Sequence, residues 1–254
     1  MKKQNISDKA PVKVSVIGIP VSAVTMESAL AFVAENLDTI RGEYVCASNV
    51  HTTVMARENI AYKEVQSQAV MALPDGKPLS VVGVKRADCA MEKVTGTHFM
   101  QNIFLDPRFA GKRHYFYGTE PETLEKMIAK VSEDYLQLTI CGWEPSVFRE
   151  LSDAEVDELA MRINTAAADF IWVALGAPRQ ENLMYRLQGK TNGLMVGVGG
   201  AFKILAGMIE DAPAWMQNMG LEWFYRLLQE PGRLFKRYAT TNSKFIYYLL
   251  SERK

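Results

Sequence analysis

The sequence predicts an α/β protein in which a mainly parallel sheet carries helices on both faces and is followed by a helical C-terminal appendage. Short apolar runs rich in β-branched residues alternate with longer amphipathic stretches, which is typical of strands alternating with helices. From about residue 211 the strand patterns stop and only helical patterns remain. We therefore expect an α/β body over residues 1–210 and a helical appendage over residues 211–254.

The expected elements of the body follow one another along the chain. Strand patterns cover residues 12–19, 43–47, 68–73, 113–117, 137–141, 169–175 and 193–198. Helical patterns cover residues 25–37, a stretch that reaches residue 68, and residues 98–105, 120–132, 153–165 and 178–188. Capping-box spacing in residues 119–122 and 152–155 predicts where two of these helices begin. Ligands of parallel α/β sheets bind beyond the carboxyl ends of the strands, so we expect the site there.

Composition limits the partners and the cellular compartment that can be expected for the protein. Of 254 residues, 29 are Lys or Arg and 29 are Asp or Glu, so the overall charge predicts no polyanionic partner such as nucleic acid. Cys46, Cys89 and Cys141 lack the spacing of a disulfide framework or a zinc site, which fits a reducing cytoplasm. The polar first ten residues and the absence of a long apolar run predict neither a signal peptide nor a membrane span.

Two polar residues lie just past expected strands. Asp75 could serve as a general base in a cleft, or it could simply close a Pro-Asp-Gly turn, and spacing alone favours the turn. Asn49 could bind a substrate or cap the helix that follows it. Both side chains are expected at the carboxyl edge of the sheet.

Two glycine-containing strand ends could cradle a diphosphate or a sugar. After Gly176 a proline precedes a helical pattern, so free N–H groups are expected to point outward beside Arg179 and Gln180. The other strand end closes with Gly199 and Gly200. Neither has the context of a dinucleotide fingerprint or a P-loop, so a nicotinamide-dependent oxidoreductase is not supported.

Metal and hydrolase motifs are also missing from the sequence. His51, His98 and His114 are scattered without metal-ligand spacing, and a structural role is expected for each. No Gly-x-Ser-x-Gly elbow and no DxD motif occurs. The sequence therefore predicts no metal site and no serine hydrolase.

The C-terminal segment mixes basic, apolar and aromatic residues. Residues 226–254 contain seven basic and two acidic residues, interleaved with leucine, phenylalanine and tyrosine. On helices this pattern suits an anionic membrane surface, at ~1 kcal/mol per well-placed cation. A helix packed on the body with a solvated basic face fits equally well, and the apolar face could also serve a second copy in a homo-oligomer.

The motifs of the chain, taken together, resemble those of a known family. Residues 221–231, Leu-Glu-Trp-Phe-Tyr-Arg-Leu-Leu-Gln-Glu-Pro, resemble the LEW-x-YRL-x-x-EP signature of the WecG/TagA/CpsF transferases, glycosyltransferase family 26. Further landmarks appear upstream in the family's order: Gly18-Ile19-Pro20-Val21, Asn49, Asp75-Gly76, Val94-Thr95-Gly96, and residues 176–181 and 197–200. The ordered set spans about residues 12 to 240.

The resemblance implies a Rossmann-like catalytic domain with a membrane-associating appendage. It implies an inverting, metal-independent and cofactor-free transfer from a UDP-sugar that carries N-acetylmannosamine, its uronic acid or a related sugar. The acceptor would be a polyprenyl-diphosphate-linked sugar used for teichoic acid or surface polysaccharide. The protein would act in the cytoplasm, peripheral on the inner face of the cell membrane.

The resemblance also implies roles for residues. Asp75 matches the proposed base, and Asn49 and Gln180 match positions that line the sugar pocket. Further substrate-binding positions are Arg179, Gly118, Gly176, Gly199 and Gly200. Basic residues of the appendage expected to reach the donor diphosphate, and to stabilise its charge in place of a metal, are Arg226, Arg233, Lys236 and Arg237.

Some positions depart from the family pattern. Ala47, Lys93 and His98 stand where threonine, arginine and aspartate are usual, which leaves the donor sugar open. Lys203 and Asp211 both reverse the usual sign of charge, which predicts that they form an ion pair with each other. These departures keep a second function open, that of a non-catalytic sugar-nucleotide-binding subunit of a polysaccharide assembly complex.

Overall fold

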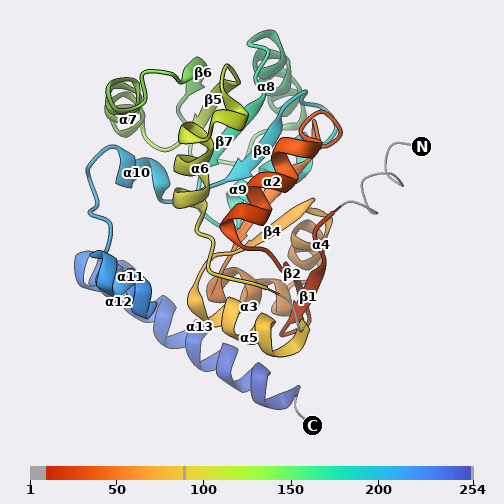
Figure 1. Ribbon diagram of the computed structural model, residues 1–254, viewed down its shortest axis with the longest axis vertical. Coiled ribbons are helices and arrows are strands. Elements are labelled where there is room, and N and C mark those ends of the chain that lie inside the picture. The colour runs from red at the N-terminus through yellow and green to blue at the C-terminus, as the bar shows by residue number, and fades with distance from the viewer. Residues whose placement is uncertain (1–9, 88–89, 253–254) are drawn as a thin grey trace.

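The centre of the molecule is a six-stranded sheet in the order β4-β3-β8-β7-β5-β6, and every neighbouring pair runs parallel (Figure 1). The computed structural model describes residues 10–87 and 90–252. The strands are β3 Tyr44–Ser48, β4 Met71–Pro74, β5 Arg113–Gly118, β6 Thr139–Glu144, β7 Phe170–Ala174 and β8 Leu194–Gly197. This architecture confirms the predicted Rossmann-like α/β fold.

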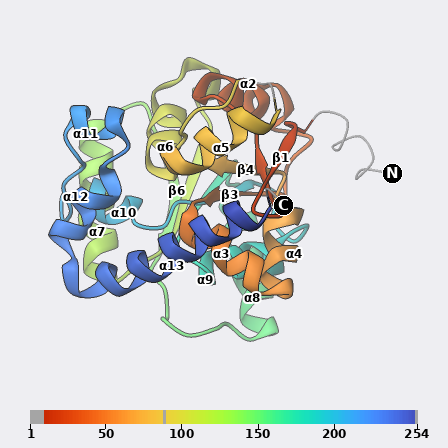
Figure 2. The same ribbon diagram turned by 90° about the horizontal axis from the view of Figure 1, so that it is seen from below.

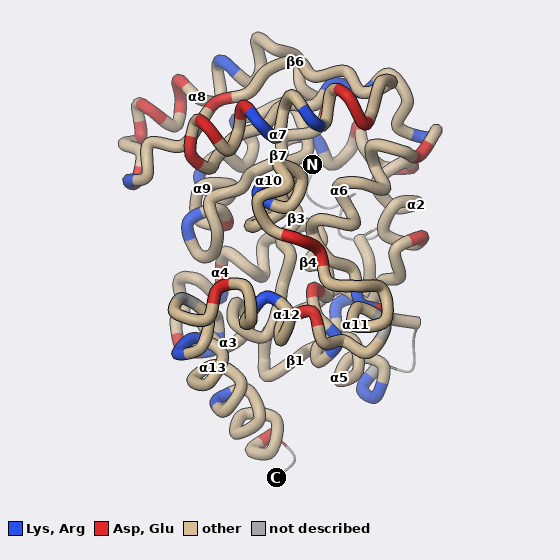
Figure 3. The backbone as a smooth tube through the Cα atoms, turned by 90° about the vertical axis from the view of Figure 1, so that its left-hand side faces the viewer, with Lys and Arg blue, Asp and Glu red and all other residues tan. Residues whose placement is uncertain are grey.

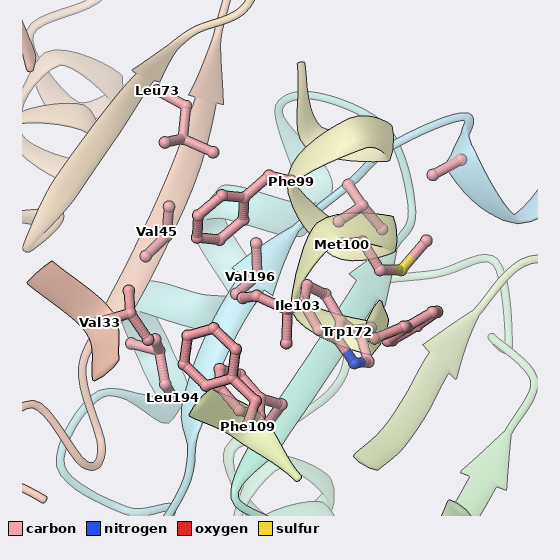
Figure 4. Close-up of a cluster of buried hydrophobic side chains, with 14 of the residues drawn as sticks. Val33, Val45, Leu73, Phe99, Met100, Ile103, Phe109, Trp172, Leu194 and Val196 are labelled. Carbon is pink, nitrogen blue, oxygen red and sulfur yellow. The ribbon is translucent and has the colours of Figure 1, made fainter. Parts of the chain in front are cut away.

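Helices cover both faces of the sheet, because successive strand residues point to opposite sides and both sides are apolar. In β7, Phe170 and Trp172 join one core cluster, whereas Ile171 and Val173 join the other. Figure 4 shows Phe99 of the covering helix over the sheet in the first cluster. The first face is covered by α2 Met26–Asn36, α6 Gly96–Leu105, α7 Pro121–Asp134 and α10 Ala201–Leu205, and the second by α8 Asp153–Thr165 and α9 Arg179–Leu187.

The first expected strand is a hairpin outside the main sheet. β1 Lys13–Val16 and β2 Ile19–Ser22 pair antiparallel about a tight turn. Ile17 and Gly18 both have positive φ in this turn, 48° and 76°. The prediction of one strand over residues 12–19 is therefore wrong, because a β-branched residue at positive φ gives no turn signal in the sequence.

The expected helical stretch up to residue 68 is divided into α3 Val50–Glu58 and α4 Ile60–Gln68. The Asn59 side chain accepts a hydrogen bond from the N–H of Tyr62, which starts the second helix. The sequence predictions did not include α5 Lys77–Ala87. Its internal Gly83 weakens the helical pattern.

Of the two expected capping boxes, one is confirmed. Ser152 and Glu155 exchange side-chain hydrogen bonds with each other's backbone at the start of α8. The other is wrong, because Thr119 has φ 56° and α7 begins after Glu120, which makes no side-chain cap. Pro121 does lie in the first helical turn, where its missing N–H costs little.

The C-terminal region consists of α11 Ala214–Met219, α12 Glu222–Gln229 and α13 Pro231–Ser251. An extended linker leads from α10 to these helices, and α13 then runs back across the body beside α3 (Figures 1 and 2). Phe245 of α13 is buried in one cluster with Val54 of α3 and Leu79 of α5. Within the described part of the chain, no helix combines the length and apolarity needed to cross a membrane. The domain boundary near residue 211 stays a prediction.

Candidate active site

The carboxyl ends of β3, β4 and β8 lie side by side, since these strands are neighbours in a parallel sheet. Asn49 follows β3 and caps α3: its Oδ1 accepts hydrogen bonds from the N–H groups of His51 and Thr52, at 3.0 and 3.1 Å. The capping alternative for Asn49 is therefore what the structure shows. Capping uses Oδ1, and among the residues that the structure describes the Nδ2 amino group makes no hydrogen bond, so it can serve a ligand.

Asp75 follows β4 at the same edge. Its backbone N–H donates to the carbonyl of Ser48 at 2.8 Å, which ties the end of β4 to the end of β3. Within the described residues, no group donates a hydrogen bond to the Asp75 carboxylate. The carboxylate is thus not used to close the Pro-Asp-Gly turn, as the turn interpretation requires.

The surroundings of Asp75 set its proton affinity. Burial raises the pKa of Asp75 to about 6, and the negative charge of Glu222 adds to the increase. The positive charges of Arg226, Lys93 and His98 act in the opposite direction, Arg226 most strongly. A carboxyl group with this pKa is ionised at neutral pH yet basic enough to take up a proton during a reaction.

Two ion pairs beside Asp75 join the body to α12 and to the linker between α10 and α11. Lys93 Nζ lies 2.6 Å from Glu222 Oε1 of α12 and donates to the carbonyl of Gln217 in α11 at 3.2 Å. His98 Nε2 lies 3.4 Å from Asp211 Oδ2, and this contact raises the pKa of His98. Figure 3 shows the acidic stretch of the α10–α11 linker in red above α11 and α12.

The predicted ion pair between Lys203 and Asp211 is wrong. Lys203 Nζ lies 3.9 Å from Glu120 Oε1 at the start of α7, while Asp211 pairs with His98. The reason is that α10 packs on α7, whereas the linker carries Asp211 back to the first turn of α6. Lys93 and His98 were noted in the sequence only because they depart from the family pattern. In the structure, both lie close enough to Asp75 for their charges to affect its pKa.

Arg226 of α12 reaches the glycine turn after β8. Its Nη2 is 2.8 Å from the position that a Cβ would occupy on Gly200, so the guanidinium packs where any other residue would place a side chain. Gly200 also precedes the first turn of α10. Arg226 therefore brings a positive charge from the appendage to the carboxyl edge, close enough to Asp75 to affect its pKa.

The other predicted basic residues of the appendage differ in position. Arg237 of α13 lies near His51 of α3, where its charge, together with the larger effect of burial, lowers the pKa of His51 to about 4. Lys236 is exposed. The side chain of Arg233 lies outside the described residues.

Gln180 joins two glycine turns and is almost completely buried, at 4% exposure. Its Oε1 accepts hydrogen bonds from the N–H groups of Gly176 at 3.1 Å and Gly199 at 3.0 Å. Its Nε2 donates to Oε1 of Glu181 at 2.8 Å. The N–H of Gly176 is therefore engaged within the protein and does not point outward as expected. Glu181 was missed, because a glutamate in the first turn of a helix usually faces solvent.

Arg179 and Gly118, two further positions predicted to bind substrate, make contacts away from Asp75. Arg179 Nη1 donates to the carbonyl of Phe148 at 3.2 Å and lines a separate cavity of about 260 Å³ with Arg149 and Arg186. Gly118 has φ 131°, and a Cβ there would lie 2.5 Å from the carbonyl oxygen of Ala174. The close approach of β5 to β7 therefore explains this glycine, and its role in substrate binding stays a prediction.

His114 has the structural role expected from the sequence. It is buried and stacks on Phe170 and Trp172, and its Nδ1 accepts a hydrogen bond from Trp172 Nε1 at 3.1 Å. Burial lowers the pKa of His114 to about 3. The imidazole is therefore neutral and serves as an acceptor in an aromatic core.

Comparison with known proteins shows the family to which the chain belongs. A family model described as "Glycosyl transferase WecG/TagA/CpsF family" matches residues 14–254. Two similar proteins are each named N-acetylglucosaminyldiphosphoundecaprenol N-acetyl-beta-D-mannosaminyltransferase. That of Bacillus spizizenii is 27% identical over 198 residues, covering 78% of this chain and 75% of the relative. That of Bacillus subtilis is 27% identical over 222 residues, covering 86% of this chain and 83% of the relative. The chain belongs to the WecG/TagA/CpsF family and is a glycosyltransferase.

Proposed function

From this family membership we propose that the chain moves N-acetylmannosamine, its uronic acid or a related sugar from a UDP-sugar to a polyprenyl-diphosphate-linked sugar, with inversion at the anomeric carbon. The names of the two Bacillus relatives support an acceptor of this kind and an N-acetylmannosaminyl donor. The observation that carries the mechanism is the Asp75 carboxylate, which is free of hydrogen bonds from the described residues and has a pKa of about 6.

Asp75 acts as the general base of this reaction. Its carboxylate accepts the proton of the acceptor hydroxyl while that oxygen bonds to the anomeric carbon, on the face opposite UDP. The bond between the anomeric carbon and the diphosphate oxygen breaks, and its electron pair leaves with UDP. Arg226 beside Gly200 stabilises the charge that grows on the diphosphate, in the role that a metal ion has in other transferases.

The C-terminal helices bring the protein to the acceptor. α13 packs on α3 through Phe245, yet it keeps large apolar side chains at the surface, and so do α11 and α12. The exposed set consists of Trp215, Met219, Trp223, Phe224, Leu228, Phe235, Ile246, Tyr247 and Leu250. With the exposed Lys236 beside them, these residues suit the headgroup region of an anionic bilayer, and we place the protein on the cytoplasmic face. Docking there holds Arg226 where the lipid-linked acceptor resides.

The test is UDP release from a panel of UDP-sugars, with and without a lipid-diphosphate-linked N-acetylglucosamine, each in the presence and absence of EDTA. We expect that UDP is released only when both substrates are present, that one donor of the panel is preferred, and that EDTA does not reduce the rate. UDP binding without release on any donor would instead support a sugar-nucleotide-binding subunit. Release that EDTA abolishes would contradict a metal-independent mechanism.

A further inference from the structure

A chain of buried polar side chains lies beneath the carboxyl edge of the sheet. Ser48 Oγ, at the end of β3, donates to Gln66 Oε1 at 2.8 Å, and Gln66 Nε2 donates to Tyr62 Oη at 3.0 Å. All three side chains are buried. The Tyr62 hydroxyl interacts electrostatically with the carboxyl group of Glu181, the residue that accepts from Gln180.

Gln180 can accept hydrogen bonds from both glycine turns in only one orientation of its amide. The N–H groups of Gly176 and Gly199 both point at Oε1, and a flipped amide would present a donor to two donors. Glu181 Oε1 selects the observed orientation, since it accepts a hydrogen bond from Nε2. The two turns that Gln180 joins follow β7 and β8, neighbouring strands of the sheet.

Glu181 is suited to this task because it has no solvent exposure. Burial raises the pKa of Glu181 and so shifts the group toward its uncharged acid, which can still accept a hydrogen bond through a carboxyl oxygen. Its Oε2 makes no hydrogen bond of normal geometry within the described part of the chain. Cys46 lies nearby, but it is a buried thiol whose pKa is raised, mainly by burial, so it supplies no counter-charge to Glu181.

We propose that Glu181 is a positioning residue for sugar transfer, which fixes the Gln180 amide so that the Gly176 and Gly199 turns keep their spacing. Gly199 directly precedes Gly200, against which Arg226 packs. A shift of this turn therefore moves the contact that orients Arg226 toward the diphosphate. The inference rests on the proposed function, but the state of the clamp can be measured without any substrate.

The experiment compares Glu181→Met, which keeps the size of the side chain without its acceptor, with Glu181→Gln, which keeps an acceptor oxygen. Amide hydrogen exchange is measured at Gly176 and Gly199, together with kcat and the KM for the donor. In Glu181→Met both glycine amides should exchange about tenfold faster or more, and kcat should fall by a similar factor. Glu181→Gln should restore protection of both amides and most of kcat.

A second pair of variants keeps the proposal testable if Glu181→Met folds poorly. Gln180→Met removes the clamp itself, and adding Glu181→Gln to it should cause no further loss of kcat, since the two residues act as one unit. Unchanged exchange at both glycines in Glu181→Met overturns the proposal, and so does a loss of kcat in Glu181→Gln while both amides stay protected. If the wild type transfers no sugar but the exchange results hold, the proposed function fails and the clamp stands.

Discussion

Among single residues, Asp75 is the one whose ionisation state decides whether sugar transfer can proceed by the proposed mechanism. A base must be deprotonated to accept a proton, so with a pKa of about 6 the value of kcat/KM should fall about tenfold per pH unit below pH 6 and level off above pH 7. The positive charge of His98 lowers the pKa of Asp75. His98→Gln should therefore move the midpoint of the pH profile upward. A profile that is flat between pH 5 and 7, or a midpoint that moves down, would contradict this environment for Asp75.

Gly200 and Arg226 give a second prediction at this scale. A Cβ on Gly200 would lie 2.8 Å from Arg226 Nη2, and the flexible arginine can give way while the backbone, at φ −75°, accepts alanine. Gly200→Ala should therefore fold normally and lower kcat about tenfold or more through the displaced charge. Gly232→Ala is the matched control, because its Cβ would meet nothing within 4 Å. Equal kcat values in the two variants would remove Arg226 from the mechanism.

Some site residues could be predicted from the sequence and others could not, and the difference lies in whether their surroundings are local in the chain. Asp75 and Asn49 belong to an ordered set of family landmarks, and both lie at the carboxyl edge as expected. Glu181 carries no sequence signal of burial, because its surroundings are made by α4, which is distant in sequence. The partners of Lys93 and Asp211 depend on how the linker is routed, which no local pattern records.

At the scale of elements, Lys93 holds α11 and α12 against the body. Its side chain and that of Glu222 are 15% and 22% exposed, so their ion pair is less screened than a surface pair. Lys93→Met should raise the rate of proteolytic cleavage in the linker over residues 206–213 about fivefold or more, because it leaves Glu222 unpaired. The control is Lys126→Met, which breaks an exposed pair with Glu122. Equal cleavage rates in both variants would show that the pair does not tether the helices.

Helices and strands could be predicted from the sequence where a hydrophobic pattern or a capping motif gives a clear local signal. The Ser152 capping box and the apolar strand β7 have clear local signals, and both are found as expected. The hairpin at Ile17 and the helix α5 were missed because their residues contradict their structure, with a β-branched residue at positive φ and an internal glycine at 83. In both places tertiary packing overrides propensity, since Ile17 and Leu79 are buried together in one cluster.

At the scale of the whole molecule, one surface is expected to meet the bilayer. Trp215 of α11 and Trp143 of β6 are both exposed, but only Trp215 lies among the apolar residues of the C-terminal helices. Trp215→Ser should weaken sedimentation with phosphatidylglycerol vesicles about tenfold, and Trp143→Ser should leave it unchanged. High salt should weaken binding of the wild type as well. Equal losses in both variants would place the contact elsewhere.

The overall architecture was predictable because alternating strands and helices leave few arrangements for a sheet buried on both faces. The strand order, however, places the ends of β3, β4 and β8 together, although β8 follows β4 by more than a hundred residues. This arrangement brings Asn49, Asp75 and the glycine turn after β8 to one edge, and α12 completes it with Arg226.

The role of Asp75 as the base is tested by the rate of sugar transfer in Asp75→Asn, measured with saturating donor and lipid-linked acceptor beside the affinity of the same variant for UDP. Asparagine has nearly the same shape but cannot take up a proton. If Asp75 is the base, kcat should fall about 10²-fold or more while UDP binds as tightly as in the wild type. Transfer at the wild-type rate with normal UDP affinity would show that another group, or none, accepts the proton.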